Sequence, residues 1–97
     1  MLQVQVSEIE KALARLLEAL REQQGEVVEL PEADYYWAVA PDQLYDPYQT
    51  PSRLTLGQLS DDLEEMGRIA TQDAPPVSID FVKLSAVLAA IGHKTVW

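Results

Sequence analysis

The chain has 97 residues and a mass of 10.8 kDa, with 47% apolar and 24% charged residues, which is typical of one small globular domain spanning residues 1–97. Cysteine is absent, which excludes disulfides, thiolate metal sites and a catalytic thiol, and fits a reducing compartment. Seven Lys and Arg residues against 16 Asp and Glu residues leave a net charge of -9. Because such a surface repels the phosphate backbone, we expect no direct binding of nucleic acid.

The hydropathy pattern also bears on membrane association. The longest apolar runs, such as Ala86 to Ile91, are far shorter than the ~20 residues that a membrane-spanning helix needs. The first residues lack the basic and apolar regions of a secretory signal. We therefore expect a cytoplasmic protein with no membrane partner.

The segment from Glu8 to Gln24 has the pattern of an amphipathic helix. Ser7 followed by Glu10 forms a capping-box sequence, and Gly25 supplies a stop. The apolar positions recur every three or four residues, at Ile9, Leu13, Leu16, Leu17 and Leu20. The sequence therefore predicts a helix that packs by one face.

After Gly25 the pattern changes to short runs rich in β-branched and aromatic residues. Residues 26–30 and 35–39 are candidate strands, and residues 31–34 between them are turn-like, so a β-hairpin is predicted. Residues 2–6 alternate apolar and polar side chains and are a candidate third strand. Residues 41–51 contain three prolines and three apolar anchors, Leu44, Tyr45 and Tyr48, and are expected to form an ordered loop that lies across the helices.

Two further helices are predicted in the second half of the chain. Thr55 and Gln58 resemble a capping box before a helix that runs to about Gln72 and is ended by residues 73–76. Ser78 is the expected cap of a third helix that stops at Gly92. The predicted fold is mainly α (small α+β): a three-helix domain with a short β-hairpin or extended aromatic segment between the first two helices.

The residues offer little support for catalysis. His93 is the only histidine, and its position after Gly92 suits the negative end of the third helix. The glycines are too scattered to cradle a phosphate, and the acids lack the spacing of a calcium loop. We therefore expect no enzyme activity, no cofactor and no metal.

One cluster stands out as a candidate interaction site. Five of the seven aromatic residues lie between Tyr35 and Tyr48, and residues 26–48 contain six acids and no base. These rings either cap the helical layer or form an interaction surface. If Tyr35 and Trp37 point inward as alternate strand residues, Tyr36 points to solvent and is the best candidate for a partner contact. The expected partner-binding residues are Asp34, Tyr36, Asp42, Tyr45, Asp46, Tyr48, Asp61 and Asp62.

These features favour a non-enzymatic, cytosolic protein–protein interaction module that meets a basic partner, such as an inhibitor or immunity-type protein. An alternative is a small-molecule-binding protein or carboxylate-assisted enzyme with a pocket between the aromatic loop and the second helix. The one-faced first helix and the broad apolar face of the third helix also favour a homodimer.

Four segments resemble a family of small bacterial proteins, found especially in cyanobacteria. They are Asp34-Tyr35-Tyr36-Trp37, Leu44-Tyr45-Asp46-Pro47-Tyr48, the run from Leu54 to Asp62 with the sequence LTLGQLSDD, and the closing run from Leu84 to Gly92. The resemblance implies the order of the elements over about residues 8–92. It implies no catalytic residue, cofactor or substrate.

Overall fold

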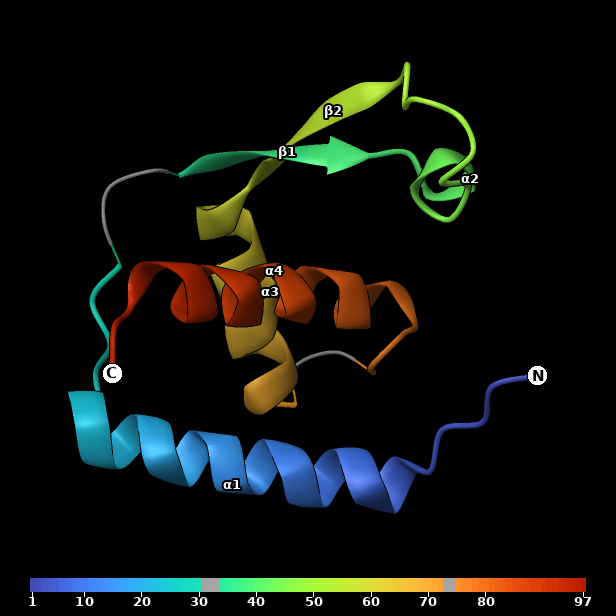
Figure 1. The fold of residues 1–97 in the computed structure, drawn as a ribbon. Helices are drawn as coiled ribbons and strands as arrows, with labels where there is room; N and C mark the ends of the chain where they lie inside the picture. The colour runs from blue at the N-terminus through green and yellow to red at the C-terminus, as the bar shows by residue number, and fades with distance from the viewer. Residues whose placement is uncertain (31–33, 73–74) are drawn as a thin grey trace. The chain divides into compact units, whose positions relative to one another are not determined.

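The computed structural model describes residues 1–30, 34–72 and 75–97 of the chain (Figure 1). Two compact units are distinguished: Met1–Glu29 together with Trp97, and Leu30–Val96. In the described residues there are four helices and one two-stranded antiparallel sheet, so the mainly α architecture with a small β element is confirmed. None of the described helices has the length and apolar character that crossing a membrane requires.

The first unit is built on helix α1 (Val6–Gln24). The end of α1 is as predicted, because Gly25 adopts a left-handed φ of 87° and its N–H donates to the carbonyl of Arg21. The predicted cap is wrong: the N-cap position is Gln5, and no side chain caps this helix end. Residues 2–5 form no strand, and Val6 already belongs to α1.

The second unit contains the sheet, formed by strands β1 (Tyr35–Val39) and β2 (Leu54–Gln58). The strands pair antiparallel with Trp37 opposite Leu56. The predicted hairpin is therefore wrong in its partner: residues 26–30 form no strand, and the turn predicted at residues 31–34 falls mostly outside the described residues. Residues 54–58 were expected to lead into a helix, but their alternating Leu54, Thr55 and Leu56 suit a strand that gains a partner 15 or more residues away.

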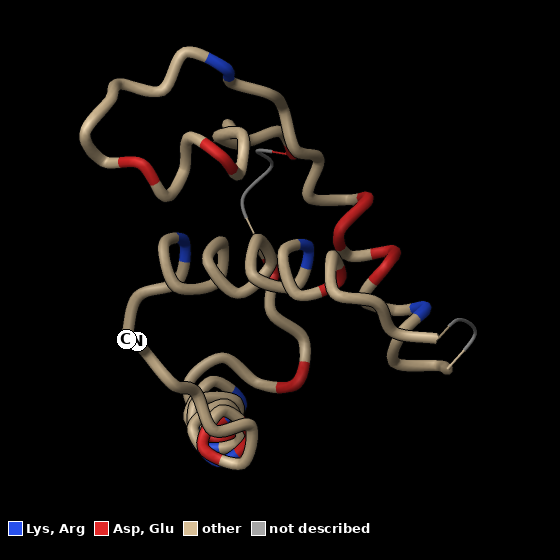
Figure 2. Tube along the Cα trace, turned by 90° about the vertical axis from the view of Figure 1, so that its right-hand side faces the viewer, with Lys and Arg blue, Asp and Glu red and all other residues tan. Residues whose placement is uncertain are grey.

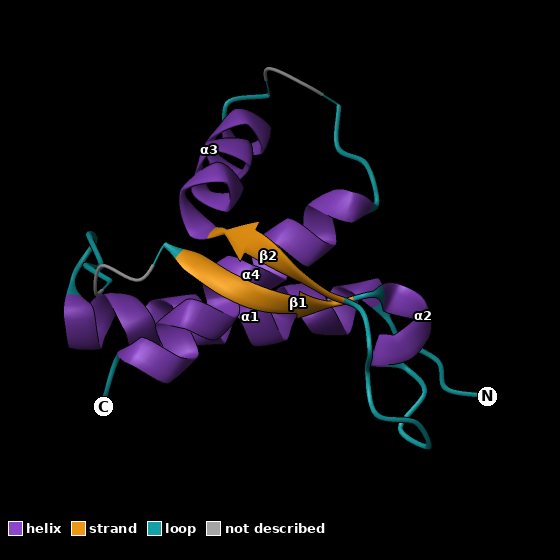
Figure 3. Cartoon of the chain, turned by 90° about the horizontal axis from the view of Figure 1, so that it is seen from above, coloured by secondary structure: helices purple, strands orange, loops and turns teal. Residues whose placement is uncertain are grey.

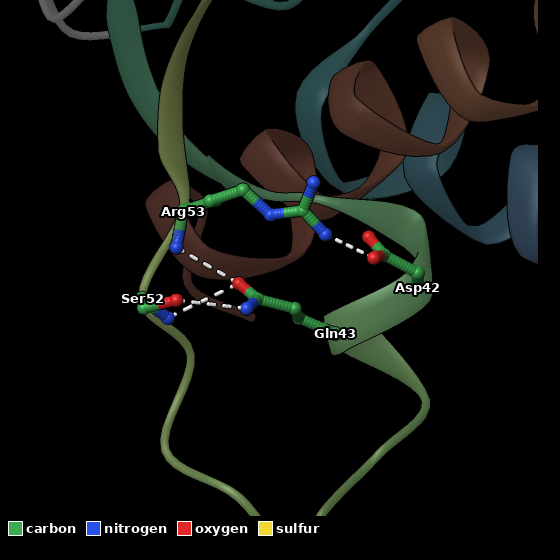
Figure 4. A network of polar contacts seen from close by, with 4 residues as sticks. All are labelled: Asp42, Gln43, Ser52 and Arg53. Carbon is green, nitrogen blue, oxygen red and sulfur yellow. Dashed lines mark hydrogen bonds and ion pairs between the residues drawn. The ribbon is translucent and has the colours of Figure 1, made fainter.

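The connection between the strands is ordered by helix α2 (Pro41–Leu44), where a loop was predicted. The side-chain carbonyl of Gln43 accepts hydrogen bonds from the backbone N–H groups of Ser52 (3.1 Å) and Arg53 (2.8 Å). Its amide donates to the Ser52 hydroxyl (2.9 Å), and Arg53 forms an ion pair with Asp42 (Figure 4). At the base of this connection, the Gln43 side chain thus bonds backbone N–H groups that lie just before the paired residues of β2.

Helices α3 (Leu59–Ala70) and α4 (Ile79–Lys94) pack against each other and cross (Figures 1 and 3). Beyond α3, Gln72 takes a left-handed φ of 62°. Residues 73 and 74 of the predicted stop lie outside the described part. Helix α4 begins as predicted after Ser78, but the Ser78 side chain makes no cap; instead the Asp80 carboxylate accepts a bond from the Val77 N–H (2.8 Å). Helix α4 continues through Gly92, so Gly92 is not its stop.

The centre of the second unit lies where the sheet meets the two crossed helices. Seen from above, the strands lie over α4 (Figure 3). Among the described residues, Leu59 at the start of α3 and Val87 in α4 are the buried apolar side chains, and Asp62 is the buried charged one. The core is therefore small, and most large apolar side chains remain exposed.

Candidate functional site

One face of the sheet is held against α3 by Tyr36. Its hydroxyl donates a hydrogen bond to the carboxylate of Asp62, which is only 6% exposed. Burial, and then the bond to Asp62 and its charge, raise the pKa of Tyr36 from 10.0 to about 12. The ring lies across Gly57, its partner in the sheet register, where a Cβ atom would collide with it. The prediction that Tyr36 points to solvent is therefore wrong.

Asp34, the residue directly before β1, fixes the beginning of α3. Its carboxylate accepts bonds from the Ser60 N–H (2.7 Å), the Ser60 hydroxyl (2.9 Å) and the Gln58 side-chain amide (3.0 Å). Its backbone carbonyl accepts from the Leu59 N–H (2.6 Å). The Gln58 amide, and then the bonds from Ser60, hold the pKa of Asp34 below its ordinary value of 3.8. Asp34 therefore acts as a helix cap supplied from 26 residues away in sequence.

The opposite face of the sheet is open, and we call it the outer sheet face. Because side chains alternate along a strand, turning Tyr36 inward turns its neighbours outward. Trp37 is 71% exposed, and Leu56, which lies opposite it in the register, is 62% exposed. Tyr35 and Leu54 extend the same face and are also exposed. The prediction that Tyr35 and Trp37 point inward is wrong, and their exposure produces a continuous apolar surface.

The rest of the predicted cluster lies on the connection between the strands. Tyr45 and Tyr48 are exposed, Tyr48 at 94%, so they do not anchor this segment across the helices as expected. Asp46 accepts a bond from the Tyr48 N–H (3.3 Å), which shapes a local turn. Asp42 is paired with Arg53, a base that lies just outside the acidic segment in sequence.

The acidic residues are separated by this arrangement into two groups. Asp34 and Asp62 make the internal bonds described above, whereas Asp61 and Glu64 are exposed on α3. Figure 2 shows acids on the connection around α2 and along α3, as well as on α1. Of the predicted site residues, Asp46 and Asp61 thus keep carboxylates with no ion-pair partner among the described residues, and the structure draws Asp34, Tyr36 and Asp62 into the fold.

The hollows of the second unit offer little carboxylate chemistry. A hollow of about 300 Å³ lies between β1 and α4, and its described lining contains no Asp or Glu. A hollow of about 370 Å³ belongs to the connection itself, from Val39 to Pro51, and includes Asp46. An apolar groove of about 270 Å³ lies between α3 and α4, where Glu65 is paired with Arg68 and Asp80 holds the Val77 N–H. In the described part of the chain, no three His, Asp or Glu side chains gather as a metal ion would require.

Comparison with known proteins adds no identity to this geometry. No family model, curated protein or solved structure matches the chain. The resemblance noted from four sequence segments therefore stays a prediction.

Sequence reasoning missed the two leucines of the outer sheet face. Leu54 and Leu56 were assigned to a helix entrance, although each alternates with a small or polar neighbour, Thr55 and Gly57. That alternation was the available signal for a strand. Gly57 was a second signal, because a glycine within a strand often marks the close approach of another group.

Proposed function

We propose that the chain is a non-enzymatic, cytosolic protein–protein interaction module whose outer sheet face docks a basic protein. The observation that carries this proposal is the exposed pair Trp37 and Leu56, flanked by Tyr35 and Leu54. Contiguous exposed apolar surface commonly marks a binding site, and Trp and Tyr are enriched among the residues that contribute most to binding.

The charge of the surroundings supports a basic partner. Residues 26–48, which include β1, carry six acids and no base. Arg53 neutralises Asp42, but Asp46, Asp61 and Glu64 remain available to attract positive charge. Such acids act mainly on the association rate, and the apolar face supplies the contact that slows dissociation. An inhibitor or immunity-type protein that covers a basic surface is the narrower form of this proposal.

The alternative, a carboxylate-assisted enzyme, has less support. A general acid at neutral pH needs a raised pKa, whereas that of Asp34 is lowered. Asp62 is bound to the Tyr36 hydroxyl, and Asp34 to the first turn of α3. Both carboxylates therefore stabilise the fold through hydrogen bonds.

Photo-crosslinking from single positions tests the proposal. A benzoylphenylalanine placed at Trp37 is expected to capture a basic protein when lysates are irradiated, with a yield that falls when the salt concentration is raised beforehand from about 0.05 to 0.5 M. The same group at Tyr45, which is also an exposed aromatic position, serves as the matched control. Capture from position 45 but not 37, or capture of an acidic protein only, would contradict the proposal.

Affinity capture with substituted baits separates the contact from folding. Trp37→Ala and Leu56→Ser are expected to lose the crosslinked partner while the melting temperature stays within a few degrees, because both side chains are exposed. Tyr45→Ala is expected to retain it.

A further inference from the structure

The apolar residues of α1 follow a heptad repeat. Five of them alternate at spacings of three and four residues and occupy the a and d positions of a coiled coil: Val6, Ile9, Leu13, Leu16 and Leu20. The flanking e and g positions add Leu17 and the small residues Ala12 and Ala19. A heptad spacing is the pattern that two helices need to interlock their side chains along a shared seam.

Within the first unit, no residue of this stripe is buried. Helix α1 has no buried residue, and Leu16, at the middle of the stripe, is 61% exposed. Val6, Ile9 and Leu17 are exposed as well. At 19 residues α1 is about 28 Å long, and an isolated helix of this length is marginal in water unless its apolar face packs on something.

The charges of α1 decide which partner fits. With the exception of Glu10, every charged residue of α1 lies at a b, c or f position, away from the seam. In a parallel pair Glu10 would face Gln5 of the other copy, and in an antiparallel pair it would face Gln24. In neither orientation do two like charges meet across the seam. Residues 1–25 carry four acids and three bases, whereas residues 26–48 carry six acids and no base.

We infer that the a/d stripe of α1 is the interface for a second copy of this chain. Two molecules of charge -9 repel each other, and at the nearly neutral apolar stripe of α1 they meet with less repulsion than at the acidic residues 26–48. The outer sheet face lies in the acidic part of the sequence and suits a basic partner instead. The two surfaces therefore select different partners by their charge.

The expected dimer is symmetric and weak. Most homodimers form about a two-fold axis, which brings the same helix from each copy together. Because α1 is shorter than three heptads, we expect a Kd of about 10 µM rather than the nanomolar values of long coiled coils.

Sedimentation equilibrium of the full chain at about 2 to 200 µM and physiological salt tests this interface. The average mass is expected to rise from 10.8 kDa toward twice that value. Leu16→Glu should raise the Kd at least about 100-fold, because it places a charge in the seam of each copy. Ala14→Glu is the matched control: it adds the same charge two residues away, outside the seam, and should sediment as the unsubstituted chain does.

A second variant guards against a trivial loss of folding. Gln23 is the polar residue at the last d position, and Gln23→Leu should tighten the dimer about tenfold by extending the apolar seam. If Leu16→Glu unfolds, as judged by circular dichroism, this gain decides the question. A mass of 10.8 kDa at every concentration, a dimer unaffected by Leu16→Glu, or no tightening by Gln23→Leu would overturn the inference.

Discussion

At the scale of single residues, the bond between Tyr36 and Asp62 carries a clear stability prediction. Asp62 is buried, and its carboxylate would lose a donor in Tyr36→Phe. We expect this substitution to lower the free energy of unfolding by about 1–3 kcal/mol at neutral pH. Urea denaturation followed by circular dichroism measures the change, and an unaltered midpoint would show that the bond contributes nothing.

The same bond predicts a pH dependence. The pKa of Tyr36 is raised from 10.0 to about 12 in the folded chain, so the folded state holds this proton more tightly than the unfolded state. The resulting stabilisation is complete below pH 10 and is lost as the pH rises toward 12. Stability of the unsubstituted chain should therefore fall over this interval by more than that of Tyr36→Phe. Equal slopes for the two proteins would rule out Tyr36 as the titrating group.

The two helix ends near Ser7 and Asp34 predict opposite outcomes for cap removal. Asp34→Ala should lower the melting temperature, because the Ser60 N–H loses its acceptor. Ser7→Ala should change the free energy of unfolding by less than about 0.5 kcal/mol, because Ser7 is not the N-cap of α1. The contribution of Asp34 is present above its unfolded pKa of 3.8 and disappears as the pH falls below it. Melting curves of both variants at neutral pH and below pH 3.8 measure this. A Ser7→Ala variant as unstable as Asp34→Ala would contradict the cap assignment.

At the scale of elements, two glycines near α3 should respond oppositely to the same substitution. A Cβ atom at Gly57 in β2 would collide with the Tyr36 ring, so Gly57→Ala should destabilise by about 1–3 kcal/mol. A Cβ atom at Gly67 in α3 meets no atom within 4 Å, so Gly67→Ala should stabilise by about 0.5–1 kcal/mol through helix propensity. Denaturation midpoints of the two variants provide the measurement. Equal effects would mean that Tyr36 does not cover Gly57.

The sheet itself depends on contacts outside its two strands. An isolated two-stranded sheet is marginal in water, and here Tyr36 ties β1 to α3 while Gln43 closes the connection at its base. The outer sheet face supplies neither of these contacts. Its side chains can therefore change in sequence with little cost to the stability of the fold.

At the scale of the whole molecule, net charge predicts how self-association responds to salt. Two copies of charge -9 repel each other, and at 0.1 M salt this repulsion is screened beyond about 10 Å. We expect the dimer to strengthen as salt rises, whereas binding of a basic partner should weaken. Sedimentation and partner capture across the same salt series measure both trends. A dimer that weakens with salt would show that attraction between opposite charges, not the apolar stripe, holds it together.

The sequence by itself determined what depends on neighbours in the chain. Helical spacing located the bodies of α1, α3 and α4, Gly25 located the end of α1, and composition indicated a mainly α fold with a small β element. These features follow from interactions within a few residues of each other. Composition also identified the acidic aromatic segment. It did not indicate that Asp34 and Tyr36 form hydrogen bonds within the fold.

Only the tertiary structure decided which face of β1 is buried and which strand is its partner. Alternation fixes that Tyr36 lies opposite to Tyr35 and Trp37, but both phases satisfy a period of two. The choice was made by Asp62 and Gly57, more than 20 residues away, which together accept the Tyr36 hydroxyl and make room for its ring. In the same way, Asp34 became a helix cap because strand pairing carried it to α3. Such long-range contacts are invisible to local pattern, and they turned a predicted core residue, Trp37, into the centre of the candidate binding surface.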